Sequence, residues 1–126
     1  MHKSRLAGFN IDCQSNDLDG AARFWSAALG MRDVGLGEGG GVYKSLDASA
    51  RDLVIEVQTV AHPSRIHVDI ETDNIEAEVV RLEKLGAKRV EFVKSWQVME
   101  APTGQRFCVI RAKTSLDGTP GATTWP

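Results

Sequence analysis

A short segment in the middle of the chain, residues 65–71, alternates polar and apolar side chains with a period of two. This period is typical of a β-strand that has one buried face and one polar face. The apolar positions are Ile66, Val68 and Ile70, and the polar positions between them are His67, Asp69 and Glu71. A histidine and an acid are uncommon on the solvent side of a strand, so this polar face is the first candidate for a functional surface.

Residues 6–14 show nearly the same alternation near the N-terminus and predict a second strand of this kind. Its apolar positions are Phe9, Ile11 and Cys13, and its polar positions are Asn10, Asp12 and Gln14. A helix is predicted next over residues 18–29, where one apolar stripe is formed by Leu18, Ala22, Trp25 and Leu29. Asp17 has the character of an N-cap, and Gly30 is typical of a helix end. Further strands are expected at 31–34, 42–46 and 53–60.

The cycle restarts after the break at His62-Pro63-Ser64. The strand at 65–71 is followed by a capping segment, 72–74, and by a predicted helix over 75–85. The apolar stripe of this helix consists of Ile75, Val79, Leu82 and Leu85, and Gly86 ends it. Strands are expected at 89–93, 96–99 and 106–111, with a turn at 101–104 between the last two.

The two halves therefore repeat one order of elements, strand, helix and three strands. Asn10 corresponds to His67 and Asp17 to Asn74, each 57 residues further on. The pattern predicts an α+β fold built from two βαβββ modules, the first at about 5–61 and the second at about 64–112. We expect a single domain over 1–126, in which residues 113–126, rich in Gly, Pro and Thr, form a flexible tail.

Composition restricts the class of protein further. The chain has 126 residues, 42% hydrophobic and 25% charged, which is ordinary for a globular protein, and a net charge of −2. Basic residues form no cluster of the kind that neutralises phosphates, so we expect no nucleic-acid partner. No apolar run is long enough to span a membrane. We expect no secretory signal, because the first residues have no apolar core behind their charges. Two cysteines without CxxC spacing favour reduced thiols in a cytoplasmic protein.

Ordered motifs from residue 6 to residue 111 resemble the vicinal oxygen chelate superfamily of glyoxalases, bleomycin-resistance proteins and extradiol dioxygenases, and within it the glyoxalase-like subgroup. The motifs are Ile11-Asp12-Cys13, Phe24-Trp25, Ala28-Leu29-Gly30, Arg65-Ile66-His67-Val68-Asp69-Ile70, Leu85-Gly86-Ala87, Trp96-Gln97-Val98-Met99 and Ala101-Pro102-Thr103-Gly104-Gln105-Arg106-Phe107-Cys108. The resemblance implies that each module curls its sheet into half of a cup, with the helix outside. It also implies pairing as a homodimer. It does not fix an activity, because the superfamily contains both enzymes and metal-free binding proteins.

Metal-using members of the superfamily carry ligands on the first and last strands of each module. By this resemblance the four positions are Asn10, Glu56, His67 and Cys108. An amide at Asn10 and a thiol at Cys108 depart from the usual set of His or Gln with Glu, so the cofactor is expected to be either none or a divalent metal. If a metal binds, zinc on His67, Glu56 and Cys108 is the expected arrangement, since a thiolate suits zinc.

Other polar residues complete the candidate site. Asp12 and Asp69 occupy equivalent positions, where they act either as a general acid/base pair or as structural acceptors of hydrogen bonds from the backbone, Arg65 or Arg106. Arg106 shares a face with Cys108 and suits a ligand carboxylate. Trp96, beside a turn, suits stacking on a planar ligand. The glycine-rich loop at 35–41 lacks the ending of a phosphate loop and is expected to be a lid.

Two functions follow from these residues. The first is a protein that binds a small organic molecule in the cup, without a tightly bound catalytic metal, with Asn10, Asp12, Asp69, Trp96, Arg106 and Cys108 as ligand contacts. The alternative is a divalent-metal-dependent lyase or isomerase in which His67 and Glu56 are catalytic.

Overall fold

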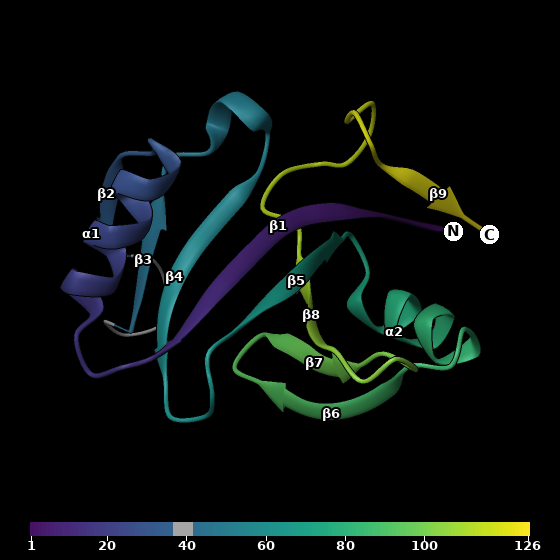
Figure 1. Ribbon diagram of the computed structural model, residues 1–126. Coiled ribbons are helices and arrows are strands. Elements are labelled where there is room, and N and C mark those ends of the chain that lie inside the picture. Colours follow the sequence, from purple (N-terminus) through teal and green to yellow (C-terminus); the bar gives the residue numbers. More distant parts are fainter. Residues whose placement is uncertain (37–41) are drawn as a thin grey trace. The chain divides into compact units, whose positions relative to one another are not determined.

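The structure is a computed structural model that describes residues 1–36 and 42–126 (Figure 1). The first half of the chain contains, in order, β1 (His2–Gln14), α1 (Leu18–Leu29), β2 (Asp33–Leu36), β3 (Tyr43–Leu46), a 3-10 turn (Ser49–Arg51) and β4 (Val54–Val60). The second half contains β5 (Arg65–Thr72), α2 (Ile75–Lys84), β6 (Lys88–Val93), β7 (Trp96–Glu100), β8 (Arg106–Arg111) and β9 (Thr123–Trp125). The α+β class and the doubled βαβββ order are confirmed.

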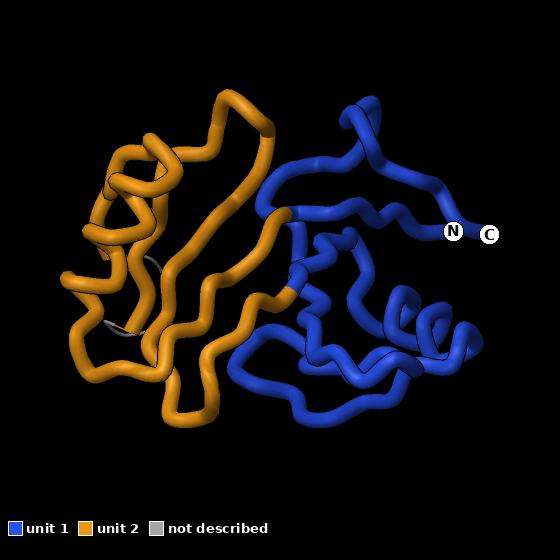
Figure 2. The backbone as a smooth tube through the Cα atoms, in the orientation of Figure 1, with its two compact units in different colours: residues 1–7, 68–126 blue, residues 8–67 orange. Residues whose placement is uncertain are grey.

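The chain divides into two compact units, and each is described by itself (Figure 2). Unit 2 consists of residues 8–67 and contains most of the first βαβββ repeat. Unit 1 consists of residues 1–7 and 68–126 and contains most of the second repeat together with both chain ends. Strands β1 and β5 each pass from one unit into the other. Most of the glycine-rich loop predicted as a lid, residues 37–41, lies outside the described residues.

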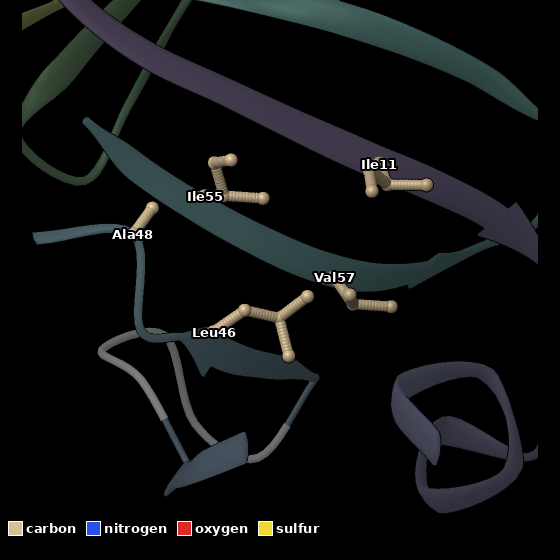
Figure 3. Close-up of a cluster of buried hydrophobic side chains, with 5 residues drawn as sticks. All are labelled: Ile11, Leu46, Ala48, Ile55 and Val57. Carbon is tan, nitrogen blue, oxygen red and sulfur yellow. The ribbon is translucent and has the colours of Figure 1, made fainter. Parts of the chain in front are cut away.

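Unit 2 has the strand order β2-β3-β4-β1, in which β1 runs parallel to β4 and the other pairs are antiparallel. Asn10 is the register partner of Glu56 in the parallel pair. The core lies between these strands and α1, and its buried side chains are Ile11, Leu46, Ala48, Ile55 and Val57 (Figure 3). Phe9, Cys13 and Trp25 pack against this cluster, so the predicted apolar face of β1 does meet the helix stripe.

The predicted signals at both ends of α1 are confirmed. The Asp17 side chain accepts a hydrogen bond from the backbone N–H of Gly20 at 2.9 Å, which satisfies one of the first N–H groups of the helix. Gly30 ends the helix with a left-handed φ of 68°. These two local signals fix where the helix begins and ends, and they orient it over the apolar face of β1.

Unit 1 repeats the same topology. β5 runs parallel to β8, and β8, β7 and β6 continue as antiparallel neighbours. The Asn74 side chain caps α2 through the backbone N–H of Ala77 at 3.1 Å, as its equivalence to Asp17 predicts. The buried core of this unit consists of Val79, Leu82, Met99 and Val109. Helix α2 packs over β8, β7 and β6.

Two residues of the predicted apolar face of β5 are not buried. The side chains of Ile66 and Val68 are 58% and 44% exposed, whereas Ile70 packs against the core of unit 1. The polar neighbour Asp69 is buried, with 7% exposed. The prediction that this apolar face is buried is therefore wrong for Ile66 and Val68, because the helix of this repeat covers the strands beyond β5.

Both chain ends are more ordered than the sequence pattern suggests. β1 begins at His2, four residues before the predicted strand. The tail expected to be flexible over 113–126 forms β9 near its end, antiparallel to the first residues of β1. This pairing places Trp125 opposite His2 and Thr123 opposite Ser4, more than a hundred residues away in the sequence. Because the strand forms only through this distant partner, the tail itself shows no periodic pattern that would predict it.

Candidate functional site

The polar face of unit 2 is buried at its centre. Asn10 and Asp12, two residues apart on β1, are 6% and 2% exposed. Alternation along a strand places both on the side opposite Ile11, which belongs to the hydrophobic core. Two adjacent polar side chains withdrawn from water need hydrogen-bond partners, since an unpaired buried polar group costs about 1–3 kcal/mol.

His67 supplies a partner to both of them. Its Nδ1 lies 2.6 Å from Oδ2 of Asp12, and its Nε2 lies 3.1 Å from Nδ2 of Asn10. A carboxylate only accepts, so Nδ1 carries the proton and donates it to Asp12. Nε2 then holds a lone pair and accepts from the amide of Asn10. The three side chains form one continuous hydrogen-bonded chain, which fixes the orientation and the tautomer of the imidazole.

These hydrogen bonds among Asn10, His67 and Asp12 leave two buried side-chain oxygens without a donor. Among the described residues, Oδ1 of Asn10 and Oδ1 of Asp12 are the buried side-chain atoms without a hydrogen-bond partner. Natural structures leave few such atoms, and those that occur often mark a place where a water, an ion or a ligand binds. Both lie on the residues that flank His67, so this part of unit 2 is the candidate functional site.

Charged groups lie on two sides of the hydrogen-bonded side chains of Asn10, His67 and Asp12. Nε of Arg65 lies 3.7 Å from Oδ2 of Asp12, and its side chain is 44% exposed. On the other side Glu56, the register partner of Asn10, is met by the Ser45 hydroxyl at 3.5 Å. Asp12 therefore interacts with both His67 and Arg65.

A cleft of about 260 Å³ opens beside Asp12. Asp12, Ser64 and Arg65 form its polar side, and Ile11, Trp25 and Ile66 contribute apolar walls. Cys13 also lines the cleft; burial raises the pKa of its thiol and the Asp12 carboxylate adds to this rise, although a hydrogen bond from Trp25 opposes it. The thiol stays protonated at neutral pH, so Cys13 acts as a wall of the cleft and not as a nucleophile.

A larger cleft, of about 500 Å³, lies between α1 and strands β2 and β3. Its basic group, Lys44, is bound by Asp19 at 2.9 Å and by Asp33 at 3.1 Å. These contacts, with Asp19 the stronger, raise the pKa of Lys44. Two carboxylates thus already compensate the charge of the lysine. None of the described residues that line this cleft carries a buried, unsatisfied acceptor like those beside His67.

The remaining predicted site residues lie in unit 1. Asp69 and Cys108 are both buried and are register partners on β5 and β8. Nε of Arg106 lies 3.3 Å from Glu100, its register partner, so a ligand carboxylate would compete with a carboxylate already present. Trp96 is half-buried at the start of β7. The structure thus groups Asn10, Asp12, Glu56 and His67 in unit 2 and the other predicted residues in unit 1.

The donors in unit 2 fit a tightly bound divalent metal poorly. Asn10 presents its amide N–H, not its oxygen, to Nε2 of His67, and an amide is a weak neutral ligand in any case. Glu56 is the one carboxylate at the three family positions in this unit. The zinc arrangement on His67, Glu56 and Cys108 stays a prediction, since Cys108 belongs to the other unit.

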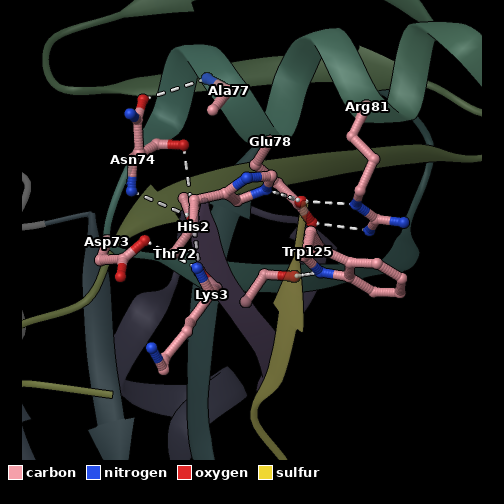
Figure 4. Close-up of polar contacts among 10 residues, drawn as sticks. His2, Lys3, Thr72, Asp73, Asn74, Ala77, Glu78, Arg81 and Trp125 are labelled. Carbon is pink, nitrogen blue, oxygen red and sulfur yellow. Dashed lines mark hydrogen bonds and ion pairs between the residues drawn. The ribbon is translucent and has the colours of Figure 1, made fainter. Parts of the chain in front are cut away.

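A second polar cluster, which the sequence pattern did not reveal, lies in unit 1 (Figure 4). Glu78 on α2 is fully buried and binds Nε2 of His2 at 2.8 Å and the guanidinium of Arg81 at 2.7 and 2.9 Å. That guanidinium lies 3.8 Å from the ring centre of Trp125, whose Nε1–H donates to the Ser4 hydroxyl at 2.9 Å. The cluster joins both chain ends to α2. One sequence feature could have indicated this cluster: Glu78 is an acid at a helix position that faces the core.

Comparisons with known proteins agree with the fold. Residues 9–110 match the model of a family described as "Glyoxalase-like domain". Among solved structures, a hypothetical protein from Bacillus halodurans is 14% identical, with a TM-score of 0.65 over 89% of this chain and 96% of that one. Methylmalonyl-CoA epimerase from Mycobacterium tuberculosis is also 14% identical, with a TM-score of 0.64 over 91% of this chain and 92% of that one.

An extradiol ring-cleaving dioxygenase from B. fuscum is 14% identical, with a TM-score of 0.57 over 87% of this chain and 33% of the dioxygenase. No curated protein matches the sequence. None of the helices in the described part of the chain is long and apolar enough to cross a membrane. At these identities the solved structures establish the fold and leave the activity open. The family match covers most of the chain, and the protein therefore belongs to the glyoxalase-like domain family of the vicinal oxygen chelate superfamily.

Proposed function

We propose that this protein binds a small organic molecule on the polar face of unit 2, without a tightly held catalytic metal. The observation that supports this most directly is the buried chain of Asn10, His67 and Asp12, with its two unsatisfied oxygens. A ligand with hydrogen-bond donors would satisfy those oxygens.

Two measurements test this proposal. Metal analysis of protein purified without an affinity tag is expected to find first-row metals well below one ion per chain, and a stoichiometric metal would contradict the proposal. The second measurement screens a collection of small polar organic compounds for binding by protein NMR. Compounds that bind are expected to shift the backbone resonances of Asn10, Asp12 and His67. Binders that shift only residues around Lys44 would instead point to the larger cleft.

A divalent-metal-dependent lyase or isomerase is the second candidate. One observation favours it: a metal-bound histidine commonly donates its other ring N–H to a carboxylate, as His67 does to Asp12. In that case the metal would act as a Lewis acid, with His67 and Glu56 as ligands or base. Titration with zinc, nickel and manganese should then give tight binding to the natural protein and none to His67→Ala. Equal binding to both would exclude His67 as a ligand.

Assembly as a homodimer belongs to the same proposal. Ile66 and Val68 are exposed on β5, where a β-strand with apolar side chains is a suitable surface for a second copy. Sedimentation velocity is expected to show a dimer that Ile66→Lys weakens. A monomer at all concentrations would contradict it.

A further inference from the structure

The cleft of about 260 Å³ beside Asp12 is a site that the proposed function does not use. It lies at the end of β1 and the start of β5, next to α1, and every residue that lines it belongs to unit 2. Ile11 and Trp25, two of its walls, lie on the core side of β1, where Figure 3 shows Ile11. Asn10 and His67 are not among its lining residues. The cleft is therefore distinct from the polar face of unit 2.

The apolar part of the cleft is held in place before a ligand binds. Trp25 packs against the core of unit 2, and its ring meets the ring of Phe24 edge-on, with 5.2 Å between the ring centres. Its indole N–H donates a hydrogen bond to the thiol of Cys13. The polar group of the indole is thus satisfied, and the ring contributes hydrocarbon to the cleft. Together with Ile11 and Ile66 it forms walls that suit a flat apolar molecule.

Two hydrogen-bond donors line the cleft on neighbouring residues. Nε of Arg65 lies 3.7 Å from Asp12, and the two terminal nitrogens of Arg65 have no acceptor among the residues that the structure describes. The Ser64 hydroxyl accepts the backbone N–H of Gln14 at 2.9 Å, a bond that fixes the position of Ser64 beside the end of β1. Within the described chain, the hydrogen of this hydroxyl has no acceptor either. Both residues can therefore donate to a ligand.

The charges at this end of the cleft favour an anion with a single charge. The planar fork of a guanidinium matches the two oxygens of a carboxylate, and such charge-assisted hydrogen bonds are strong. Asp12 accepts the N–H of His67 at 2.6 Å and lies near Arg65, so its negative charge is partly compensated. It still repels other anions. A phosphate monoester, with a charge of about −1.5 to −2 at neutral pH, is repelled more strongly than a carboxylate.

We infer that this cleft is a second binding site of the protein and that its ligand is a small aromatic monocarboxylate. The carboxylate binds to Arg65 and Ser64, and the ring packs against Trp25 and the two isoleucines. The volume of about 260 Å³ is below the roughly 300–1,000 Å³ of sites for drug-sized molecules, so the ligand has one or two rings. Burial of the ring supplies affinity, and the guanidinium supplies selectivity for the anion.

The probe is 1-naphthoate, and 1-naphthamide is the matched neutral compound with the same rings. In a protein NMR titration, naphthoate is expected to shift the indole resonance of Trp25, assigned with Trp25→Phe, and the backbone resonances of Ser64 and Arg65. Naphthoate should bind at least about tenfold more tightly than naphthamide, since hydrogen bonds to a charged group are the stronger ones. 1-Naphthyl phosphate should bind more weakly than naphthoate, because Asp12 repels its additional charge.

Variants of Arg65 test the polar end of the cleft. Arg65→Gln should bring the ratio of the two affinities close to one and retain the binding of naphthamide, which shows that the cleft is still folded. Arg65→Lys keeps the charge without the fork and should keep only part of the preference. Arg23→Gln is the matched control, because Arg23 is an exposed arginine that lines the larger cleft instead. It should bind both compounds as the natural protein does.

Equal affinities of the natural protein for naphthoate and naphthamide, or no binding of naphthoate, would overturn this inference and leave the proposed function standing. A preference for naphthoate that persists in Arg65→Gln would overturn it as well. Shifts confined to Asn10 and His67 would place naphthoate on the polar face, which would support the proposed function and overturn the second site. Tighter binding of the phosphate would contradict the choice of a carboxylate.

The proposed homodimer also uses Ile66, so the titration is repeated over a range of protein concentrations. A single affinity for naphthoate is expected throughout, since Ile66 is one wall among several. If binding is lost as the dimer forms, the second copy occupies the cleft in place of a carboxylate, and the inference is wrong.

Discussion

At the scale of single residues, Glu78 shows how a buried charge is retained. Burial raises its pKa, but hydrogen bonds from Arg81, His2 and Ser4 outweigh this effect and lower the pKa below the ordinary 4.5. Glu78→Gln removes the charge and leaves Arg81 without its buried partner. We expect the free energy of unfolding to fall by about 2–3 kcal/mol at neutral pH, measured by urea denaturation.

The same carboxylate predicts a pH dependence. Because the folded pKa is lowered, the stabilisation is present above the unfolded pKa, near 4.5, and is lost as the pH falls through the lower folded pKa. The natural protein should therefore lose stability more steeply below pH about 4.5 than Glu78→Gln. As a control, Glu83→Gln on the exposed face of α2 should keep the steep dependence. Parallel pH curves for the natural protein and Glu78→Gln would show that Glu78 is not ionised in the folded state.

Residue patterns predicted part of the candidate site and missed its connections. Alternation placed Asn10, Asp12 and His67 on polar strand faces, which is a local property. The partner of Asp12 was expected among Asp69, Arg65 and Arg106, because repeat symmetry suggests a pair of equivalent acids. In the structure it is His67, 55 residues away, together with Arg65. Which side chains meet across neighbouring strands depends on register, and period-two alternation leaves register undetermined.

At the scale of elements, the two helix caps are equivalent and open to a paired test. Asp17 and Asn74 each accept a hydrogen bond from the third residue of the following turn, Gly20 and Ala77. Asp17→Ala and Asn74→Ala should each lower the stability by about 1 kcal/mol, and their effects should add, since no described contact joins them. Thermal or urea unfolding measures both. If only one of the two variants lost stability, the two N-caps would not contribute equally to the stability of their helices.

The parallel pairing of β1 and β4 depends on a glycine. Gly8 faces Val54 across the pair, and a Cβ added at Gly8 would lie 1.8 Å from the backbone oxygen of Val54. Backbone atoms cannot turn aside as a flexible side chain can, so Gly8→Ala should separate the strands and cost at least about 3 kcal/mol, or prevent folding. Gly30→Ala is the matched control: it has open space and only a left-handed φ of 68°, so about 1 kcal/mol is expected. Similar losses for both variants, measured by urea unfolding, would contradict the steric argument.

The bounds of the two helices were predicted well because their signals are local. Helix α1 occupies the predicted residues, with its cap at Asp17 and its end at Gly30. β9 was missed because three residues of a Gly- and Thr-rich tail become a strand only by pairing with β1, more than a hundred residues away. Contacts of such separation are fixed by the folded chain, and no short window of sequence contains them.

At the scale of the whole molecule, the two units should respond separately to loss of the C-terminal contacts. Trp125 holds the tail in unit 1 by its bond to Ser4 and by its ring against Arg81, and the described core of unit 2 does not include it. Trp125→Ala should cost about 2–3 kcal/mol, because both contacts and the half-buried ring are lost. Trp125→Phe keeps an aromatic ring for Arg81 and should lose only about 1 kcal/mol, the value of the bond to Ser4.

Hydrogen exchange locates the effect. In Trp125→Ala the amides of residues 2–4 and of α2 are expected to exchange faster, because β9 no longer pairs with β1 and the network around Glu78 loosens. The amides of β3 and β4, in unit 2, should keep their exchange rates under conditions where local opening dominates. Equal acceleration in both units would mean that they unfold as one body. The candidate site on His67 would then depend on the tail for its stability, although it makes no described contact with Trp125.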